Sequence, residues 1–251
     1  MASSEAASPD SGALDSSIAQ LEGGGWTQDR GYELLGTITA AARHGDRAAL
    51  KTIALRDQVV ALLCGLCKQQ LGPPLRRRLA EAMCAVIDAE GRAVLPIVDG
   101  VMQVLETMGA QTGGKGQTVA ASAGARVTGL HCLERVLAHI GIQALSRLPA
   151  LLAISRAAVK PGEPAPVRAR GVRALVAGIA AAAQGGRTAH EEALKLAKAL
   201  LVDRLAAVRA GARELLLAVL RAAPQPHDLH AEKVLATLAA TLEAAGPAPA
   251  P

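Results

Sequence analysis

Three stretches of this chain share one pattern of apolar and basic residues at a regular spacing. They are PLRRRLAEAMCAVI (74–87), PVRARGVRALVAGI (166–179) and AVRAGARELLLAVL (207–220), and each sets an aliphatic residue before an arginine. The second and third copies lie 41 residues apart and the first and second 92 apart, which is about two such periods. A weaker copy, AGARVTGLHCLERVL (123–137), occupies the gap. Internal repeats of this length restrict the fold to an architecture stacked from similar units.

The composition indicates that these units are helical. The chain has no Phe, one Trp and one Tyr, so Ala, Leu and Val must form the core. Such side chains favour closely packed helices over strands. Helices are expected near 29–43, 46–70, 74–89, 94–109, 117–140, 147–159, 166–184, 189–202, 206–222 and 230–244. A period of 40–47 residues with two helices each predicts an all-α, HEAT/armadillo-type α-solenoid of about ten helices in five antiparallel pairs.

The pattern also predicts how the solenoid is organised. Residues 1–25 are acidic and rich in Ser, Ala and Gly, so they are expected to be disordered. The repeat domain spans 26–244, and a Pro/Ala tail at 245–251 is expected to be disordered as well. The second helix of each pair, including 74–89, 166–184 and 206–222, is expected to line the concave side. The arginines near the start of these three helices should form a column, and Asp203 should pair with a neighbouring arginine of that column.

Charge and targeting signals restrict the cellular setting. The net charge is +5, and because residues 1–25 hold four acids and no Lys or Arg, the remainder is +9. We expect that excess to be mainly the solvated faces of helices. The chain shows no secretory signal and no uninterrupted apolar run of membrane-spanning length. Its four cysteines lack the spacing of a disulfide framework. These features predict a cytoplasmic protein without a transmembrane segment.

One loop resembles a phosphate-binding motif. The run from Gly109 to Gly116, GAQTGGKG, nearly spells a P-loop. The motif requires Ser or Thr after Lys115 to reach Mg²⁺, and a buried strand before the loop. Gly116 has no hydroxyl group, and the residues before the loop continue a helix. We therefore interpret the segment as a connection between helices.

Cysteines and histidines suggest three further sites. Cys64 and Cys67 have redox spacing but lie in an apolar helical run, where buried thiols act as small hydrophobic groups. Zinc would need two more ligands, for which His131 and Cys132 qualify only by residue type. His190-Glu191 resembles the His-Glu pairs of HEAT-built metal hydroxylases, but those enzymes need several such pairs. We expect no catalytic site, cofactor or metal.

Clustered arginines raise the alternative of nucleic-acid binding. Arg76, Arg77 and Arg78 form one run, and Arg168, Arg170 and Arg173 form a second group. Both groups offer phosphate contacts. With one Trp and one Tyr, however, the chain has almost no aromatic surface on which bases can stack. We therefore do not expect nucleic acid as the partner.

The order of several blocks resembles one known family. Gly72-Pro73-Pro74 followed by Arg76 and Arg77, and LLVDR (200–204) leading into Ala207-Val208-Arg209, are similar to N-terminal repeats of the HEAT repeat-containing protein 5 family. The resemblance covers about residues 26–222. Members of this family are long cytosolic solenoids that associate with a clathrin adaptor complex at the trans-Golgi network and endosomes. The resemblance implies a scaffold of vesicle transport that reaches membranes only through its partners.

Two alternatives to that function stay open. The second hypothesis is a HEAT adaptor or regulatory subunit of another cytosolic complex, and the third is an enzyme, which would require a metal or a nucleotide. A solenoid binds through the shape and chemistry of an extended surface. The sequence therefore predicts protein partners and no small-molecule substrate.

Overall fold

A computed structural model describes residues 27–44, 53–110, 119–181 and 187–222 of the chain. Within these ranges the chain forms nine α-helices and two 3₁₀-helices. They are α2 (Gln28–His44), α4 (Ile53–Leu66), α5 (Pro73–Ala89), η1 (Gly91–Ala93), α6 (Val94–Ala110), α7 (Val119–Ile140), η3 (Gly141–Arg147), α8 (Leu148–Ala158), α9 (Ala165–Ala181), α10 (Arg187–Leu201) and α11 (Ala206–Ala222).

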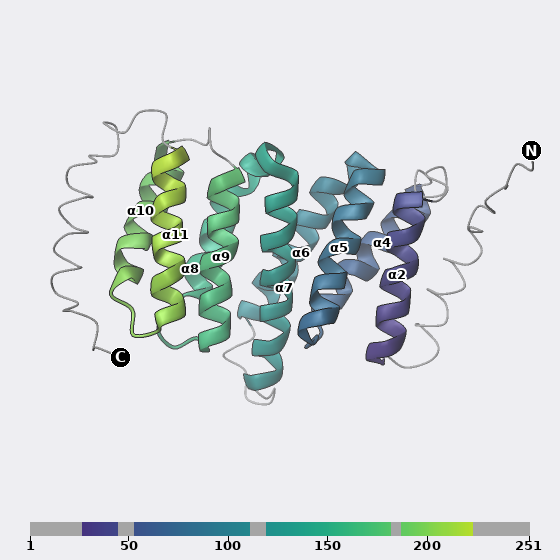
Figure 1. The fold of residues 1–251 in the computed structure, drawn as a ribbon, viewed down its shortest axis with the longest axis horizontal. Helices are drawn as coiled ribbons and strands as arrows, with labels where there is room; N and C mark the ends of the chain where they lie inside the picture. Colours follow the sequence, from purple (N-terminus) through teal and green to yellow (C-terminus); the bar gives the residue numbers. More distant parts are fainter. Residues whose placement is uncertain (1–26, 45–52, 111–118, 182–186, 223–251) are drawn as a thin grey trace, which may run out of the picture.

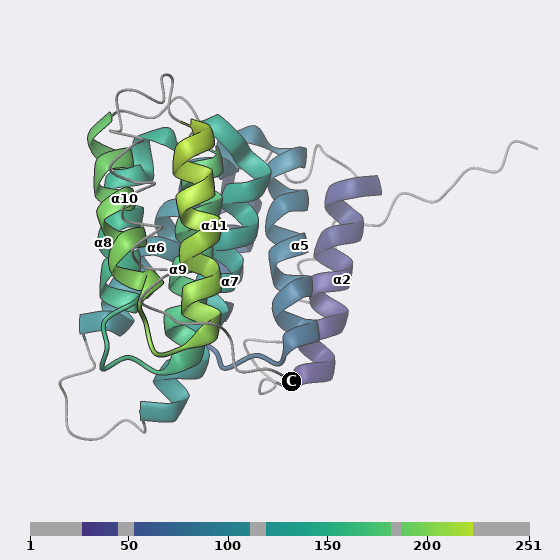
Figure 2. The ribbon, with the colours of Figure 1, turned by 60° about the vertical axis from the view of Figure 1, so that its left-hand side comes forward.

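The helices stack in two parallel layers (Figures 1 and 2). One layer, called here the α2–α11 layer, contains α2, α5, α7, α9 and α11, each packed on the next in that order. The other, the α4–α10 layer, contains α4, α6, α8 and α10. Each helix of the α4–α10 layer also packs on the helix that follows it in sequence, so the pairs are α4–α5, α6–α7, α8–α9 and α10–α11. The chain is an all-α solenoid, as its repeats predict.

The expected helices and the observed ones correspond closely. The first nine expected helices match α2 and α4 to α11, whereas the tenth, near 230–244, lies outside the described residues. The expected tails at 1–25 and 245–251 lie outside them too. The α2 helix belongs to the same layer as the second helix of each pair. Pairing therefore begins at α4, one helix later than a simple count from the first helix suggests.

The α4 helix ends at Leu66, before the expected end at 70, whereas the first part of the expected helix, 46–52, lies outside the described residues. After Leu66 the backbone makes tight turns, in which the amides of Cys67, Lys68 and Gln69 donate to carbonyls three residues earlier at 3.0–3.1 Å. Hydrogen bonds between residues three apart are typical of the tighter turn that ends an α-helix. The next helix starts where the sequence predicts, because Pro73 and Pro74 occupy its first positions, where their missing amide hydrogens are tolerated.

Core residues repeat along the layers with the same spacing. On α9 the buried set is Val167, Arg168, Gly171, Val172, Ala174, Leu175, Gly178 and Ile179, and α11 buries a similar stripe. Close approach depends on glycine: a Cβ added at Gly178 would lie 2.0 Å from a methyl carbon of Leu151, and one at Gly171 would lie 2.7 Å from the Cβ of Ala158. The small residues therefore allow α8 and α9 to pack in direct contact.

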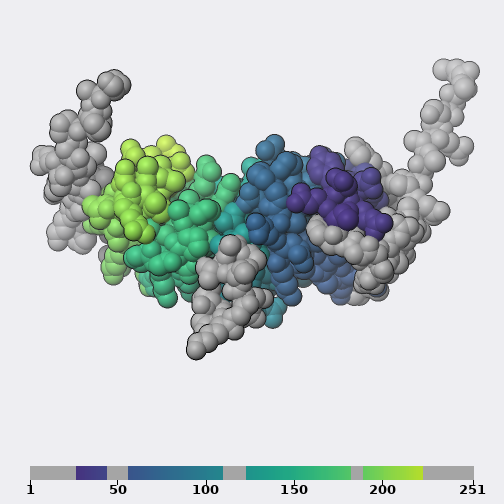
Figure 3. Space-filling model, turned by 90° about the horizontal axis from the view of Figure 1, so that it is seen from below, coloured from purple at the N-terminus to yellow at the C-terminus, as the bar shows by residue number. Residues whose placement is uncertain are grey.

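The α2–α11 layer forms one continuous outward face. In the view from below it makes the upper side of the molecule, and that side dips over α7, between α5 and α9 (Figure 3). The helices expected to line the concave side, 74–89, 166–184 and 206–222, all belong to this layer as α5, α9 and α11.

Among the described residues, one stretch is apolar enough to cross a membrane by length and composition. It runs from Ala123 to Ala158, with a mean hydropathy of 1.4 over its best window. The core helix of a water-soluble protein passes the same test, and α7 and α8 contribute Leu133, Leu137, Leu151 and Leu152 to the hydrophobic core. The stretch therefore does not establish membrane insertion.

Candidate binding surface

A buried ion pair joins the last two repeats. Arg168, at the start of α9, is 2% exposed in its side chain and donates to the carboxylate of Asp203 in the turn before α11. Its Nε also donates to the Val159 carbonyl at 3.1 Å, and Asp203 accepts from the Leu205 amide at 2.9 Å. This confirms the predicted pairing of Asp203. The pair is far more buried than an exposed surface ladder would be.

Burial alone would raise the pKa of Asp203, since it penalises the charged form. The Leu205 amide and the Arg168 guanidinium outweigh that effect and hold the pKa below its ordinary value. Asp203 is therefore ionised at neutral pH and neutralises Arg168 inside the solenoid.

The same arrangement occurs one repeat earlier. Arg126, early in α7, donates to Glu163 in the turn before α9, and its side chain is 6% exposed. Arg209, early in α11, continues the column and donates to the carbonyls of Asp203 and Arg204 at 2.8 and 3.1 Å. Arg126 was not predicted as a member of the column, because Ala125 stands where the other copies have Leu or Val. The arginine column thus crosslinks consecutive repeats.

Charge is distributed unequally between the two layers. Helices of the α2–α11 layer carry thirteen arginines and six carboxylates. Helices of the α4–α10 layer carry five basic residues and five carboxylates. Among the described helices, the excess of basic over acidic residues therefore belongs to the α2–α11 layer, whose basic residues, histidine aside, are all arginine.

The centre of that excess surrounds His131 on α7. Burial, followed by the charges of Arg170, Arg76, Arg135 and Arg77, lowers the pKa of His131 to about 4. Four guanidinium groups from α5, α7 and α9 are therefore close enough to His131 to disfavour its protonation. Its Nδ1 has no hydrogen-bond partner among the described residues, and the nearest carboxylate oxygen, on Glu134, is 4.0 Å away.

One carboxylate lies within this cluster. Glu134 of α7 accepts from Arg170 at 2.7 Å, and Arg173 approaches its other oxygen at 3.9 Å. Across the described ranges, no carboxylate pairs with Arg76, Arg77 or Arg135. We define the arginine surface as the following residues: Arg76, Arg77, His131, Glu134, Arg135, Arg170 and Arg173.

Arg76 connects this surface with an open cavity of about 1050 Å³. The cavity lies where α2, α5, α7 and α9 begin, and its lining includes Gln28, Gln70, Arg76, Gly124 and Pro166. Burial and the charge of Arg170 lower the pKa of Arg76. The segment before α7, residues 111–118, contains no Asp or Glu. Arg76 thus occupies the column position of Arg126 and Arg168 without their ion pair.

The thiols lie in the core. Cys64, Cys67 and Cys132 are buried and free, and a hydrogen bond between Cys67 and Cys132, followed by burial, raises the pKa of Cys67. Burial raises the pKa of Cys64 to about 12. Thiols with raised pKa values are poor nucleophiles and poor ligands. His131 and Cys132 lie in different environments: Cys132 is buried in the core, whereas His131 is partly exposed among the arginines. No cluster of three metal-binding side chains occurs in the described part of the chain.

The remaining sequence motifs do not form a site with one another. His190 is 1% exposed, and burial lowers its pKa, so it is a neutral core residue of α10. Most of the P-loop-like run, residues 111–116, lies outside the described residues, while Gly109 belongs to α6. Of the two arginine groups, Arg168 is buried with Asp203, and Arg78 contacts Glu81 at 3.4 Å and the ring of Tyr32.

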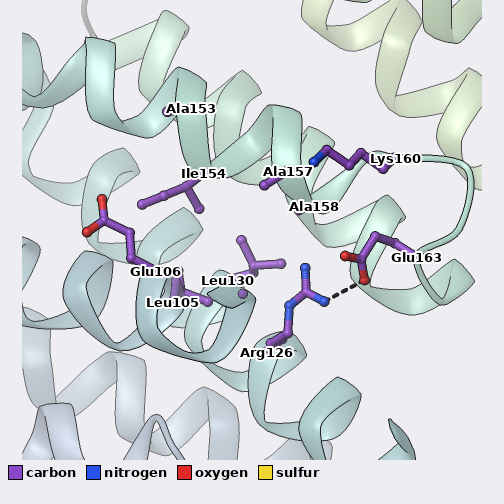
Figure 4. Close-up of a pocket in the computed structure, with 11 residues that line it drawn as sticks. Leu105, Glu106, Arg126, Leu130, Ala153, Ile154, Ala157, Ala158, Lys160 and Glu163 are labelled. Carbon is purple, nitrogen blue, oxygen red and sulfur yellow. Dashed lines mark hydrogen bonds and ion pairs between the residues drawn. The ribbon is translucent and has the colours of Figure 1, made fainter. Parts of the chain in front are cut away.

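A second cavity lies between α6, α7 and α8. It has a volume of about 420 Å³ and an apolar lining that includes Leu105, Leu130 and Ile154 (Figure 4). The Arg126–Glu163 pair lies along one side. Its charged lining residues, Glu106, Arg126, Lys160 and Glu163, balance in sign, which distinguishes it from the arginine surface.

Comparison with known proteins supports the fold. No protein-family model matches the chain, and no curated protein matches it. A designed armadillo repeat protein in complex with the peptide (KR)4 has a similar structure, with a TM-score of 0.51, 14% identity and 90% of each chain covered. An engineered protein solved by the Northeast Structural Genomics Consortium has a TM-score of 0.49 and 16% identity, with 90% of this chain and 88% of that chain covered. The chain is therefore similar in architecture to armadillo-type solenoids.

Proposed function

We propose that this chain is a protein-interaction scaffold that binds its partners through the α2–α11 layer. The observation that carries the proposal is the concentration of arginine on one of two otherwise similar layers. Packing accounts for Arg126 and Arg168, because each neutralises an acid of the next repeat. It does not account for the arginine surface, which keeps like charges together at an electrostatic cost.

The similarity to a peptide-bound designed armadillo repeat protein supports this type of function. In that protein the peptide is (KR)4, which is basic. The present chain offers arginines instead, so a bound segment would carry the opposite charge. The shared architecture supports extended-segment binding as a mode, and the residues of this chain set its chemistry.

A narrower proposal follows from the sequence resemblance. We propose that the partner assembly includes a clathrin adaptor complex, and that the chain works on the cytoplasmic side of the trans-Golgi network and endosomes. The order of the blocks around Gly72-Pro73-Pro74 and 200–209 supports it. The competing proposal is an adaptor role in another cytosolic complex.

Site-specific photo-crosslinking tests both the use of the α2–α11 layer and the identity of the partner. A photoreactive amino acid is placed at Ala138 or Ala180, which are exposed on the α2–α11 layer, or at Gln103 or Ala199, which are exposed on the α4–α10 layer. Each tagged chain is irradiated in cytosol, and crosslinked proteins are identified by mass spectrometry. We expect specific crosslinks from Ala138 and Ala180 only.

The identities of the crosslinked proteins separate the narrower proposals. Clathrin adaptor subunits would support the vesicle-transport role, and subunits of a different complex would support the competing adaptor role. Crosslinks that arise equally from Gln103 and Ala199 would contradict the proposed use of the α2–α11 layer. Failure of all four positions to yield a crosslink would contradict the scaffold function.

A further inference from the structure

We propose that the arginine surface binds an extended acidic segment of a partner protein, with carboxylates placed about every third residue. This inference rests on the proposed scaffold function and gives its partner a chemistry. Its basis is the convergence of four arginines from α5, α7 and α9 around His131, namely Arg76, Arg77, Arg135 and Arg170, and the approach of Arg173 to the neighbouring Glu134.

The guanidinium groups are available to a partner. Arg77, Arg135 and Arg173 are exposed, and the Arg173 side chain keeps 52% of its surface accessible. Glu134 is shared by Arg170 and Arg173 and is the one acid of the cluster. A planar guanidinium binds a carboxylate through two parallel hydrogen bonds, so this surface matches acidic side chains in geometry as well as in charge.

The surface also lacks features that would recognise other partners. A histidine whose pKa is about 4 stays neutral at physiological pH, so His131 adds a polar group without adding positive charge. Single-stranded nucleic acids bind through aromatic stacking, and the arginine surface contains no Phe, Tyr or Trp. Tyr32 of α2 is covered on one side by Arg78, 5.4 Å from its ring centre. The lack of aromatic residues therefore favours an acidic polypeptide over single-stranded nucleic acid, and duplex DNA, which binds through its phosphates, is included as a competitor in the test.

Helix spacing determines the pattern of charge that fits. Neighbouring packed helices lie about 8–10 Å apart, so α5, α7 and α9 span about 20 Å between the outer axes. A polyproline II segment rises about 3.1 Å per residue with three residues per turn, or about 9 Å per turn. Acids at i, i+3 and i+6 then lie on one side of the segment and meet three successive helices. Beyond Arg76, the open cavity at the helix starts provides room for the segment to continue.

Three peptides test the register. The first, EAPEAPEAP, places glutamate at every third position. The second, EEEAPAPAP, has the same composition with its acids together, and the third, KAPKAPKAP, reverses the charge. Each is labelled with fluorescein and titrated with the full chain at low and physiological salt, with anisotropy as the readout. We expect EAPEAPEAP to bind most tightly, with an affinity that falls as salt rises.

Matched triple variants test the location. One combines Arg77→Gln, Arg135→Gln and Arg173→Gln on the arginine surface. The control combines Arg156→Gln in α8, Lys160→Gln in the turn after α8 and Lys195→Gln in α10, which are exposed, lie outside the arginine surface and remove the same charge. We expect Kd for EAPEAPEAP to rise about tenfold in the first variant and less than about twofold in the control. Circular dichroism checks that both variants keep their helical content.

Each result has one meaning. Equal weakening by both triple variants would show that net charge, not the arginine surface, binds the peptide. Equal affinity for EAPEAPEAP and EEEAPAPAP would overturn the proposed register, and tighter binding of a duplex DNA competitor would overturn the choice of partner. Absence of peptide binding together with specific crosslinks at Ala138 and Ala180 would reject this inference and leave the scaffold function standing.

Discussion

The two layers of the solenoid differ in how they hold charge. In the α2–α11 layer, arginine ion pairs are buried between repeats, as in Arg168–Asp203. In the α4–α10 layer the corresponding contact is Arg156–Glu192, whose side chains are 49% and 38% exposed. Both layers use glycine for close approach, since an added Cβ would lie 2.6 Å from the Cys64 sulfur at Gly100 of α6 and 2.9 Å from Val172 at Gly211 of α11.

The difference teaches how one face of a solenoid becomes available for binding. Buried pairs fix the register of the α2–α11 layer, while Arg76, Arg77 and Arg135 have no carboxylate partner among the described residues. The balanced charges of the α4–α10 layer make it a support for the arginine surface. Four predictions test this division, from the largest expected effect to the smallest.

The largest effect is expected from charge placed in the core between the layers. Leu216 is 4% exposed and its neighbour Leu217 is 50% exposed. Leu216→Asp should lower the free energy of unfolding by about 4 kcal/mol or more, because it removes packing and buries a carboxylate. Leu217→Asp should change it by less than about 0.5 kcal/mol. Urea unfolding followed by circular dichroism measures both. Similar losses in the two variants would contradict the assigned faces of α11.

The second effect compares the ion pairs of the two layers. Asp203→Ala should cost about 3–5 kcal/mol of unfolding free energy, because it leaves the buried Arg168 without a counter-charge. Glu192→Ala removes an exposed partner of Arg156 and should cost about 0.5 kcal/mol or less. Combining Asp203→Ala with Arg168→Met should restore part of the loss. Equal costs for the two single variants would mean that the buried pair does not hold the repeats in register.

The third effect concerns helix spacing. Gly171→Ala places a methyl group 2.7 Å from the Cβ of Ala158, so α8 and α9 must separate, at a cost of about 1–3 kcal/mol. Gly65 of α4 has no neighbour within 4 Å of an added Cβ. Gly65→Ala should stabilise the chain by about 0.5–1 kcal/mol through helix propensity. Thermal unfolding should therefore show shifts of opposite sign, and a stabilising Gly171→Ala would disprove the close contact.

Local sequence patterns predicted the fold because each repeat carries its own apolar stripe. The sequence predicts the arginine column at Arg168 and Asp203, because both residues lie beside recognisable repeat residues. Arg126 lacked that signal, because Ala125 replaces the larger aliphatic residue, although Glu163 precedes Arg168 much as Asp203 precedes Arg209.

The arginine surface was beyond prediction from local pattern. The sequence predicts Arg76 and Arg77 as part of one arginine group and Arg170 and Arg173 as part of another, and it singles out neither Glu134 nor Arg135. It predicts that most of the excess charge is a solvated face. Glu134 and Arg170 are 36 residues apart and meet because helix packing turns them toward each other. The rotation of each helix depends on side-chain packing across layers, which sequence periodicity does not define to the accuracy of a hydrogen bond.

The smallest effect is a pH response that differs between the layers. Because the folded chain holds the pKa of His131 at about 4, against 6.5 for the free side chain, the unfolded state binds more protons between these values. The free energy of unfolding should therefore fall by about 1 kcal/mol from pH 6.5 to 5.5 through this residue, and the decline should end near pH 4. His131→Gln should remove that part of the pH dependence in urea titrations.

His190 supplies the contrast from the α4–α10 layer. Its pKa is lowered by burial alone, whereas burial and then Arg170, Arg76, Arg135 and Arg77 lower that of His131. Added salt screens charges but leaves burial unchanged. Raising the ionic strength should therefore shrink the pH dependence removed by His131→Gln and leave that removed by His190→Gln unaltered. Equal salt responses would mean that the arginines do not lower the pKa of His131. That result would contradict the proposed concentration of positive charge around His131 in the α2–α11 layer.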